Sequence, residues 1–332
     1  MNGRNGVWTI SDYVPQDLSE LAAMVAARIR RQRRAVPILM AHFEAPEVIV
    51  PLIENLTQHG SVVVARQNGR IAGFLGGWTI ERFFGDRNGV FVPEYGFGTD
   101  TCEPERQIEV FRKLYEERIA VWRAGGWLNH AIITYEVETK LRDFLFFGGF
   151  GGVVLDAVRP AVAMRLPVPA DIRIREVKRE DAAAMEAWRQ LHDAHRIYME
   201  SAPLYLEPSE PEDLESMTDW ITQPSHYAWI AEDAAGAPFS YLQMEPQTEG
   251  TSMLVHDARN LAVTGAFTRS SLRGNGVATL LLDAALTRAQ ELGMVSVSVD
   301  FESRNTPAVN FWTRHFTPFT FSVVRCLADP NG

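Results

Sequence analysis

Residues 260–316 decide the fold and read NLAVTGAFTRSSLRGNGVATLLLDAALTRAQELGMVSVSVDFESRNTPAVNFWTRHF. The first part is strand-like up to Thr268, and polar residues then lead into a glycine-containing hexapeptide. From Val277 onward, apolar residues recur with the 3.6-residue period of a helix, and Gly293 is typical of its end. A half-buried strand (294–300), a short helix (305–312) and a last strand (319–327) are predicted next.

The hexapeptide Arg273-Gly274-Asn275-Gly276-Val277-Ala278 has the composition of an anion-binding loop. The first amides of a helix have no intrahelical partner and lie at the positive end of the helix dipole. Gly274 and Gly276 have no Cβ, so the backbone can turn with positive φ and approach an anion closely. Arg273 adds a forked cationic donor. The loop therefore suits a pyrophosphate, and the alternative is that its glycines only turn a strand into a helix.

Two motifs in this stretch resemble the GNAT N-acetyltransferase superfamily. Arg273-x-x-Gly276-x-Ala278 is similar to the Arg/Gln-x-x-Gly-x-Gly/Ala loop that binds acyl-CoA in that family. Downstream, Asn305-x-x-Ala308-x-x-Phe311-Trp312 is similar to the family's Asn-x-x-Ala-x-x-Phe-Tyr segment. The resemblance implies an acetyl-CoA-dependent N-acetyltransferase, which transfers an acetyl group to an amine of a small molecule or peptide.

The resemblance also implies roles for individual residues. The amides of residues 273–278 would hold the CoA pyrophosphate. The backbone of Phe267 and Thr268 would contact the pantetheine arm and the thioester carbonyl, and the Asn305 side chain would touch the same arm. Trp312 stands where the family often has a tyrosine that protonates the departing thiolate. An indole N–H is not a usable proton source, so the family's acid is missing here.

The same succession of predicted elements occurs in both halves of the chain. The resemblance therefore implies an α/β (α+β) fold of two tandem GNAT-like domains, each a mixed, mostly antiparallel sheet flanked by helices, with a splayed parallel strand pair. The expected domains are residues 1–164 and 172–332, joined by a proline-containing linker at 165–171. In the N-terminal half, Asp100, Glu103 and Glu105 precede the main helix and would repel a pyrophosphate. That half is expected to be a degenerate copy.

A general base is harder to assign from the sequence. An amine must lose its proton to attack a thioester, and the thioester carbonyl must be polarised. Residues 260–268 contain no carboxylate, so Asp300 and Glu245, each at the end of another predicted strand, are the catalytic candidates. For both, an ordinary strand-end acid is the alternative. His130, on a predicted strand, is expected to be a hydrogen-bonded core residue rather than a base.

Acceptor contacts are expected from the helices between the first two strands of the C-terminal domain, because folds resembling this family shape the acceptor pocket there. The candidates are Met199, Tyr205 and Trp220, with plain core positions as the alternative.

A dinucleotide-binding Rossmann fold, and with it an NAD(P)-dependent oxidoreductase, is the rival interpretation of the same stretch. Gly274-x-Gly276-x-x-Thr279, followed by Asp300, superficially fits a strand, a glycine turn and a ribose-binding acid. However, Thr279 replaces a small residue, and residues 269–272 separate the strand from the glycines, where a Rossmann turn is tight. A further alternative is a protein that binds acyl-CoA or a partner protein without turnover, because Trp312 replaces the acid and the N-terminal half lacks the loop signature.

Two local patterns in the N-terminal half predict structure. Asn68-Gly69 between two apolar runs predicts a β-hairpin. Arginines concentrate at the end of a predicted helix over residues 17–34, where cations favour the helix dipole, and a solvated face is expected. These arginines are Arg28, Arg30, Arg31, Arg33 and Arg34.

Composition restricts the partners and the compartment. The chain has 332 residues, is 46% hydrophobic and carries a formal net charge of −10. This charge argues against nucleic-acid and anionic-membrane partners and suits a cationic amine acceptor. Cys102 and Cys326 are too few for a disulfide framework or a metal cluster, and no signal peptide or bilayer span is apparent. A cytoplasmic protein is expected, and a homodimer stays open.

Overall fold

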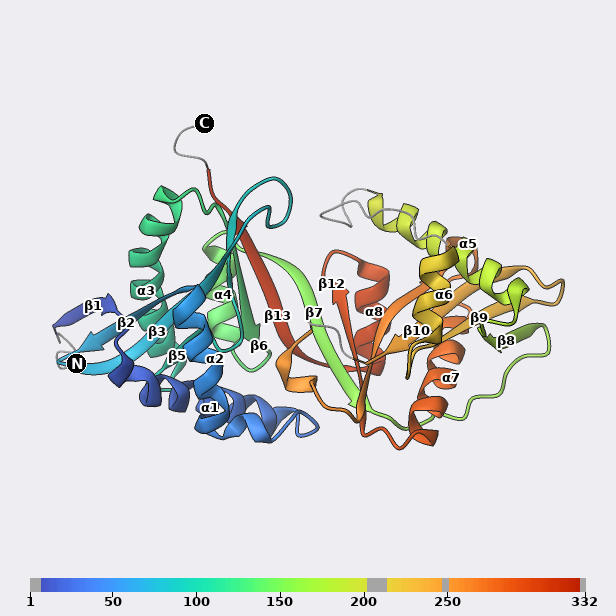
Figure 1. Ribbon diagram of the computed structural model, residues 1–332, viewed down its shortest axis with the longest axis horizontal. Helices are drawn as coiled ribbons and strands as arrows, with labels where there is room; N and C mark the ends of the chain where they lie inside the picture. The colour runs from blue at the N-terminus through green and yellow to red at the C-terminus, as the bar shows by residue number, and fades with distance from the viewer. Residues whose placement is uncertain (1–6, 202–213, 247–250, 329–332) are drawn as a thin grey trace. The chain divides into compact units, whose positions relative to one another are not determined.

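The computed structural model describes residues 7–201, 214–246 and 251–328 (Figure 1). It divides into two compact units. The first unit contains Met1–Leu155, Ser252–Leu254 and Pro318–Gly332, and the second contains Asp156–Thr251 and Val255–Thr317. Each unit combines helices with a mixed, mostly antiparallel sheet, which confirms the predicted α/β class. The units differ from the predicted domains in two places. Residues 156–171 belong to the second unit, and residues 318–332, which contain most of the last strand, belong to the first.

The sheet of the first unit has the strand order β1-β2-β3-β4-β6-β13, and β5 pairs with β3. β4 and β6 run parallel, whereas the other neighbours run antiparallel. β7 (Gly151–Pro160) contributes residues 151–155 to this unit and 156–160 to the second. The bounds of the strands are β1 Trp8–Asp12, β2 Ser61–Gln67, β3 Arg70–Ile80, β4 Gly89–Val92, β5 Phe97–Thr99, β6 Asn129–Tyr135 and β13 Thr317–Cys326.

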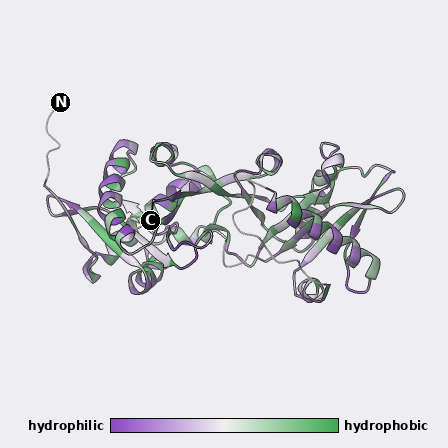
Figure 2. Cartoon of the chain, turned by 90° about the horizontal axis from the view of Figure 1, so that it is seen from above, coloured by the Kyte–Doolittle hydropathy of each residue, from purple (hydrophilic) through white to green (hydrophobic). Residues whose placement is uncertain are grey.

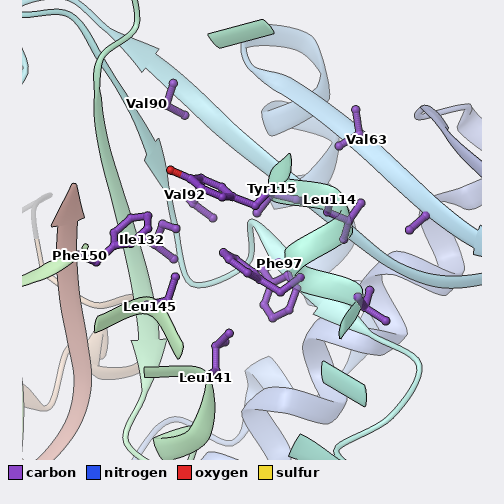
Figure 3. Close-up of a cluster of buried hydrophobic side chains, with 14 of the residues drawn as sticks. Val63, Val90, Val92, Phe97, Leu114, Tyr115, Ile132, Leu141, Leu145 and Phe150 are labelled. Carbon is purple, nitrogen blue, oxygen red and sulfur yellow. The ribbon is translucent and has the colours of Figure 1, made fainter. Parts of the chain in front are cut away.

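Helices cover both faces of this sheet. A Cβ on Gly73 of β3 would meet Val110 of α3, whereas a Cβ on Gly76 would meet Leu56 of α2, and these positions point to opposite faces. On the α3 side, valines and isoleucines of the strands pack against apolar side chains of α3 and α4, including Leu114 (Figure 3). The bounds of the helices are α1 Leu18–Ala35, α2 Pro46–His59, α3 Pro104–Ala124 and α4 Thr139–Phe147.

His130 is a core residue, as predicted. It is buried within β6, its Nε2–H donates to the Trp127 carbonyl (3.0 Å), and its Nδ1 accepts from the Tyr115 hydroxyl (2.8 Å). Burial lowers the pKa of His130 to about 4. A neutral ring with both nitrogens hydrogen-bonded has a structural role.

The hairpin prediction is confirmed. Asn68 and Gly69 connect β2 to β3 with φ values of 53° and 78°.

The prediction of a solvated arginine face on α1 is wrong for Arg28 and Arg33. Arg28 is buried and makes a bidentate ion pair with Glu138, and Arg33 bonds the Leu39 carbonyl and the Glu44 carboxylate. These arginines hold the end of α1 against the rest of the first unit.

The sheet of the second unit has the order β12-β11-β10-β9-β8. β11 and β12 run parallel, and the remaining neighbours run antiparallel. The strands are β8 Ile172–Glu176, β9 Tyr227–Asp233, β10 Pro238–Glu245, β11 Asn260–Thr268 and β12 Ser296–Glu302. The helices are α5 Ala182–Glu200, α6 Leu214–Thr222, α7 Val277–Glu291 and α8 Thr306–His315.

Apolar faces of the helices build the core of this unit. Trp188 and Leu191 of α5 pack with Met217 of α6 on Ile230 of β9. In Figure 2 the helices carry both hydrophilic and hydrophobic residues, as expected when one face is buried. α5 starts after Asp181, whose carboxylate accepts from the amide of the third residue of the helix.

The predicted linker is fixed to α7. The buried Asp283 carboxylate accepts hydrogen bonds from the amides of Met164 (2.6 Å), Arg165 (3.0 Å) and Leu166 (2.7 Å). Three backbone donors on one carboxylate hold this segment on the helix that begins at the glycine loop.

No helix in the described part of the chain has both the length and the apolar character that a bilayer span requires.

Candidate active site

A cavity of about 370 Å³ lies in the second unit, beside the end of β11 and the start of α7. It brings together most of the residues that the sequence predicted for the cofactor: Phe267, Thr268, Arg273, Gly274, Gly276, Val277, Ala278 and Asn305. Asn275 belongs to the same loop but does not line the cavity.

The glycines of the loop have the backbone geometry that the sequence predicted. Gly274 and Gly276 have φ values of 86° and 79°, in the left-handed region. A Cβ built on either glycine would meet no atom of the described chain within 4 Å. Gly276 caps α7, and helix geometry leaves the first-turn amides of Val277 and Ala278 without an intrahelical partner. An unobstructed backbone at the positive end of a helix fits a phosphate group.

Arg273 is held in place by β11 and α5. Its Nε donates to the Thr268 carbonyl (2.9 Å), and its guanidinium carbon lies 4.4 Å from the Tyr198 ring centroid. These contacts orient the guanidinium at the cavity, and the bond to Thr268 uses Nε rather than the two terminal nitrogens. The arginine is therefore pre-oriented, and less side-chain freedom is lost when it binds an anion.

β11 and β12 are paired over only part of their length. The parallel register runs from Asn260 opposite Ser296 to Val263 opposite Val299, and both strands then continue. Thr264 is an extra residue in the ladder with β10 and forms a β-bulge at the point where pairing with β12 stops. Because a bulge bends its strand, it accounts for the opening between the two strands.

The register with β10 decides which amides face this opening. Arg269 donates its amide to the Phe239 carbonyl (2.9 Å), and Tyr241 lies opposite Phe267. In an antiparallel ladder, alternate residues bond the same neighbour, so the Phe267 amide points toward β10. The amides of Ala266 and Thr268 therefore point toward the opening. The sequence analysis missed Ala266, because the register of a strand is a tertiary property.

Asn305 joins α8 to α5. Its Oδ1 accepts from the Ala308 amide (3.4 Å) as the cap of α8, and from the Tyr198 hydroxyl (3.0 Å). Its Nδ2 lies 3.8 Å from the sulfur of Met199. Met199, one of the residues predicted to contact the acceptor, therefore contacts the cap of α8 and does not line the cavity. Trp312 is buried at the cavity wall.

Two histidines and two tyrosines of the cavity wall were not predicted from the sequence: His195, His315, Tyr198 and Tyr241. His195 Nδ1 lies 2.8 Å from the Tyr241 hydroxyl, and the ring stacks on Phe267 with centroids 5.4 Å apart. Burial lowers the pKa of His195 to about 4, and His192 and Arg273 act in the same direction. The imidazole is therefore neutral at pH 7. The available signal was the pair His192 and His195, three residues apart on a predicted helix and so on one face.

The two acids predicted as catalytic bases lie outside the cavity wall. Asp300 is exposed on β12. Glu245 Oε2 accepts from the indole of Trp220 (3.1 Å) and lies 3.0 Å from His226 Nε2. Glu245 therefore connects β10 to α6 and the segment that follows it.

Two acceptor candidates remain to be placed. Trp220 packs on the core of the second unit beside Trp188 and does not line the cavity. Tyr205 lies outside the described residues.

Residues 188–316 match the acetyltransferase (GNAT) family. This match contains the glycine loop, both strands at the opening and α8. It supports an acyltransferase enzyme, in agreement with the two motifs.

Solved structures with a similar fold include a GCN5-related N-acetyltransferase from Sphaerobacter thermophilus. It is 13% identical, with a TM-score of 0.50, and 97% of each chain is covered. A second is the glucosamine N-acetyltransferase region of a fungal multi-domain GH3 β-N-acetylglucosaminidase, at 13% identity and a TM-score of 0.51. That similarity covers 96% of this chain and 38% of the fungal protein. At such low identity these structures support the fold alone. No curated protein matches the sequence.

Proposed function

We propose that the second unit is an acetyl-CoA-dependent N-acetyltransferase that transfers an acetyl group to an amine of a small molecule or peptide. The observation that carries the proposal is the left-handed glycine pair at the start of α7, inside a cavity that Arg273 also lines. Arg314 is a second cation in the wall, and the described lining residues include no carboxylate. Such a wall favours an anion as large as a diphosphate.

The opening between β11 and β12 supplies the second part of the proposal. A pantetheine arm that enters it would meet the Thr268 and Ala266 amides, which point into the opening. A backbone N–H aimed at the thioester carbonyl stabilises the negative charge that develops on its oxygen during amine attack. The strands supply position rather than a special side chain. Asn305, at the cavity wall, would contact the same arm.

We also propose that the chain contains two copies of one domain, residues 1–164 and 172–332, with a linker at 165–171. Apart from the short strand β5, the element order β1, α1, α2, β2, β3, β4, α3, β6, α4 has a counterpart in β8, α5, α6, β9, β10, β11, α7, β12, α8. In both series the fourth strand is antiparallel to the third and parallel to the next.

The first copy is proposed to have lost the cofactor site. The Arg28 guanidinium lies beside the end of β4, where it donates to the carbonyls of Glu94 (2.9 Å) and Phe97 (2.6 Å) and to the Glu138 carboxylate (2.8 Å). α3 starts at Pro104 after Glu103, with no glycine loop. A buried charge network and an acidic helix start leave this copy a role in packing or in shaping the substrate site.

Calorimetry with acetyl-CoA and with NAD(P), followed by an assay of thiol release over a panel of amines, tests the proposal. An acetyltransferase binds acetyl-CoA and releases CoA only when an acceptor amine is present. A protein that binds acyl-CoA without turnover, the alternative that Trp312 motivates, binds acetyl-CoA and releases no thiol. Binding of NAD(P) alone would overturn the proposal. The antiparallel pairing of β8, β9, β10 and β11 already disfavours a Rossmann fold, whose sheet is parallel.

A further inference from the structure

The wall of the cavity contains an imidazole that is placed to move a proton. We propose that His195 is the acid–base catalyst of this site and that Tyr241 is its positioning residue. This inference rests on the proposed acetyl transfer.

The geometry places His195 over the functional part of β11. Tyr241 and Phe267 lie directly opposite each other on β10 and β11, so their side chains share one face of the sheet. His195 of α5 reaches both, with Nδ1 2.8 Å from the Tyr241 hydroxyl and its ring tilted by 22° from that of Phe267. Thr268, whose amide points into the opening, is the next residue along β11. The imidazole is therefore adjacent to the place proposed for the thioester.

The Tyr241 hydroxyl fixes the orientation of the imidazole. With Nδ1–H donating to the buried Tyr241 hydroxyl oxygen and the ring stacked on Phe267, the imidazole is restricted in rotation and keeps the lone pair of Nε2 for the substrate. Base catalysis depends on this kind of restriction, because a proton is transferred only across a well-aligned hydrogen bond.

Several charged or titratable groups face His195. They are His192 on α5, Tyr241 on β10 and Arg273 in the loop before α7, and Tyr198 of α5 packs on the same Phe267 ring as His195. Burial and the neighbouring cation keep the ring neutral at pH 7, and a neutral ring can accept a proton. A diphosphate bound at Arg273 would offset the charge of that guanidinium and raise the pKa of His195. The base would therefore become stronger when the acyl donor is bound.

The reaction balances with this single group. The amine nitrogen attacks the thioester carbon, an N–C bond forms, and the nitrogen proton passes to His195 Nε2. The C–S bond then breaks with its electron pair moving to sulfur, and the thiolate takes the proton from the imidazolium. The products are an amide and a free thiol. One imidazole acting as base and then as acid supplies the step for which Trp312 has no proton.

Other groups in the wall are less well placed. The Tyr198 hydroxyl donates to Asn305. His315 is in the last turn of α8, with its ring 4.8 Å from that of Phe311. Its pKa is also lowered, first by burial and then by Arg159 and Arg314. His315 is therefore the matched comparison: a second cavity histidine with a lowered pKa, carried by α8 rather than α5.

The experiment first separates this inference from the proposed function. Acetyl-CoA binding is measured by calorimetry for the unmodified protein, His195→Gln, Tyr241→Phe and His315→Gln. If the unmodified protein does not bind acetyl-CoA, the proposed function fails. If it binds and turns over, the variants test His195 alone.

The kinetic readout is the pH dependence of turnover with one fixed amine. His195→Gln is expected to bind acetyl-CoA within about threefold of the unmodified protein, to lose kcat by about 100-fold or more, and to lose the acidic limb of the profile. Tyr241→Phe should retain that limb at a shifted position, with a smaller loss of kcat. His315→Gln should retain the limb unshifted. A folded His195→Gln that keeps both kcat and the acidic limb would overturn the proposal.

A second measurement does not depend on the stability of a variant. NMR titration of ¹⁵N-labelled histidines in the unmodified protein should show the His195 pKa rising when CoA is added, with the signal assigned by its absence from His195→Gln or by through-bond correlation. A His195 pKa that is the same with and without saturating CoA contradicts the inference.

Discussion

The guanidinium carbon of Arg273 lies 4.4 Å from the ring centroid of Tyr198, and its Nε donates to the Thr268 carbonyl. The cation proposed to meet the diphosphate is therefore aligned by α5 and β11 before any ligand arrives. Arg273→Gln removes the charge and should weaken acetyl-CoA binding about tenfold or more, because a charge-assisted hydrogen bond contributes about 1.5–3 kcal/mol.

Arg269→Gln is the matched control for this prediction. Arg269 precedes the loop, donates to the Pro238 carbonyl and does not line the cavity. Calorimetry should give an acetyl-CoA Kd close to that of the unmodified protein. Equal acetyl-CoA affinities of the Arg273→Gln and Arg269→Gln variants would show that Arg273 does not contribute to binding.

The glycine loop allows backbone strain to be separated from ligand access. Gly276→Ala keeps open space around its new methyl group but forces alanine to a φ of 79°, which costs about 1–2 kcal/mol. Acetyl-CoA affinity should fall as well, because the methyl group lies where the phosphate is proposed to approach.

Gly236→Ala, in the β9–β10 turn, serves as its comparison, because that glycine has a φ of 83° and equally open surroundings. Thermal unfolding should show similar losses for the two variants, and calorimetry should show a loss of affinity for Gly276→Ala alone. Equal acetyl-CoA affinities of the Gly276→Ala and Gly236→Ala variants would refute the proposal that the glycine loop binds the diphosphate.

Glu94 links stability to pH in the first unit. It is fully buried, accepts from the Ser252 hydroxyl and the Met253 amide, and burial raises its pKa to about 7. An acid whose folded pKa is raised above its unfolded value of 4.5 favours folding while it is protonated. Stability from this group is therefore present below about pH 4.5 and is lost as pH rises through about 7.

Glu94→Gln retains the size and hydrogen-bonding capacity of the side chain but cannot ionise. It should gain stability relative to the unmodified protein between pH 5 and pH 8, by about 1–3 kcal/mol, as judged by urea unfolding at each pH. Glu116→Gln, at an exposed pair with Arg112, should show no such trend. A constant difference for Glu94→Gln across this range would contradict the assignment.

His130 and Tyr115 should affect stability without affecting catalysis. Tyr115→Phe leaves the buried Nδ1 of His130 without its hydroxyl donor, which costs about 1–3 kcal/mol. Urea unfolding should detect this loss, while kcat at saturating substrates stays unchanged. A fall in kcat for a folded Tyr115→Phe would restore His130 as a catalytic candidate.

Glu245 and Asp300 are the remaining catalytic candidates from the sequence. Glu245→Gln should lower the melting temperature, because the carboxylate holds Trp220 and His226, and should leave the pH–rate profile unchanged. Asp300→Asn, at an exposed position, should change neither. A shifted profile for either variant would place that acid in the mechanism.

The backbone conformation of the glycine loop was predictable because its information is local. Positive φ at Gly274 and Gly276, the start of α7 at Val277 and the cap at Asn305 each follow from residue chemistry within a few positions. Short-range patterns also predicted the hairpin at Asn68-Gly69. These features need no knowledge of distant residues.

The proton-handling side chains were not predictable in the same way. His195 and Tyr241 are 46 positions apart, and only the packing of α5 on β10 brings the imidazole to the hydroxyl. Similarly, the register that points the Ala266 and Thr268 amides into the opening depends on the bulge at Thr264, and no local pattern marks it.

The sequence by itself determined the glycine loop and the start of α7, because backbone preference and helix periodicity act over a few residues, and the α/β class followed from the resemblance of two motifs to a family. Only the tertiary structure decided which side chains share the cavity, that Glu245 is bound to Trp220 and His226, and that the last strand pairs with β6 in the first unit. Those outcomes depend on burial and on contacts between distant segments, which local preference does not encode.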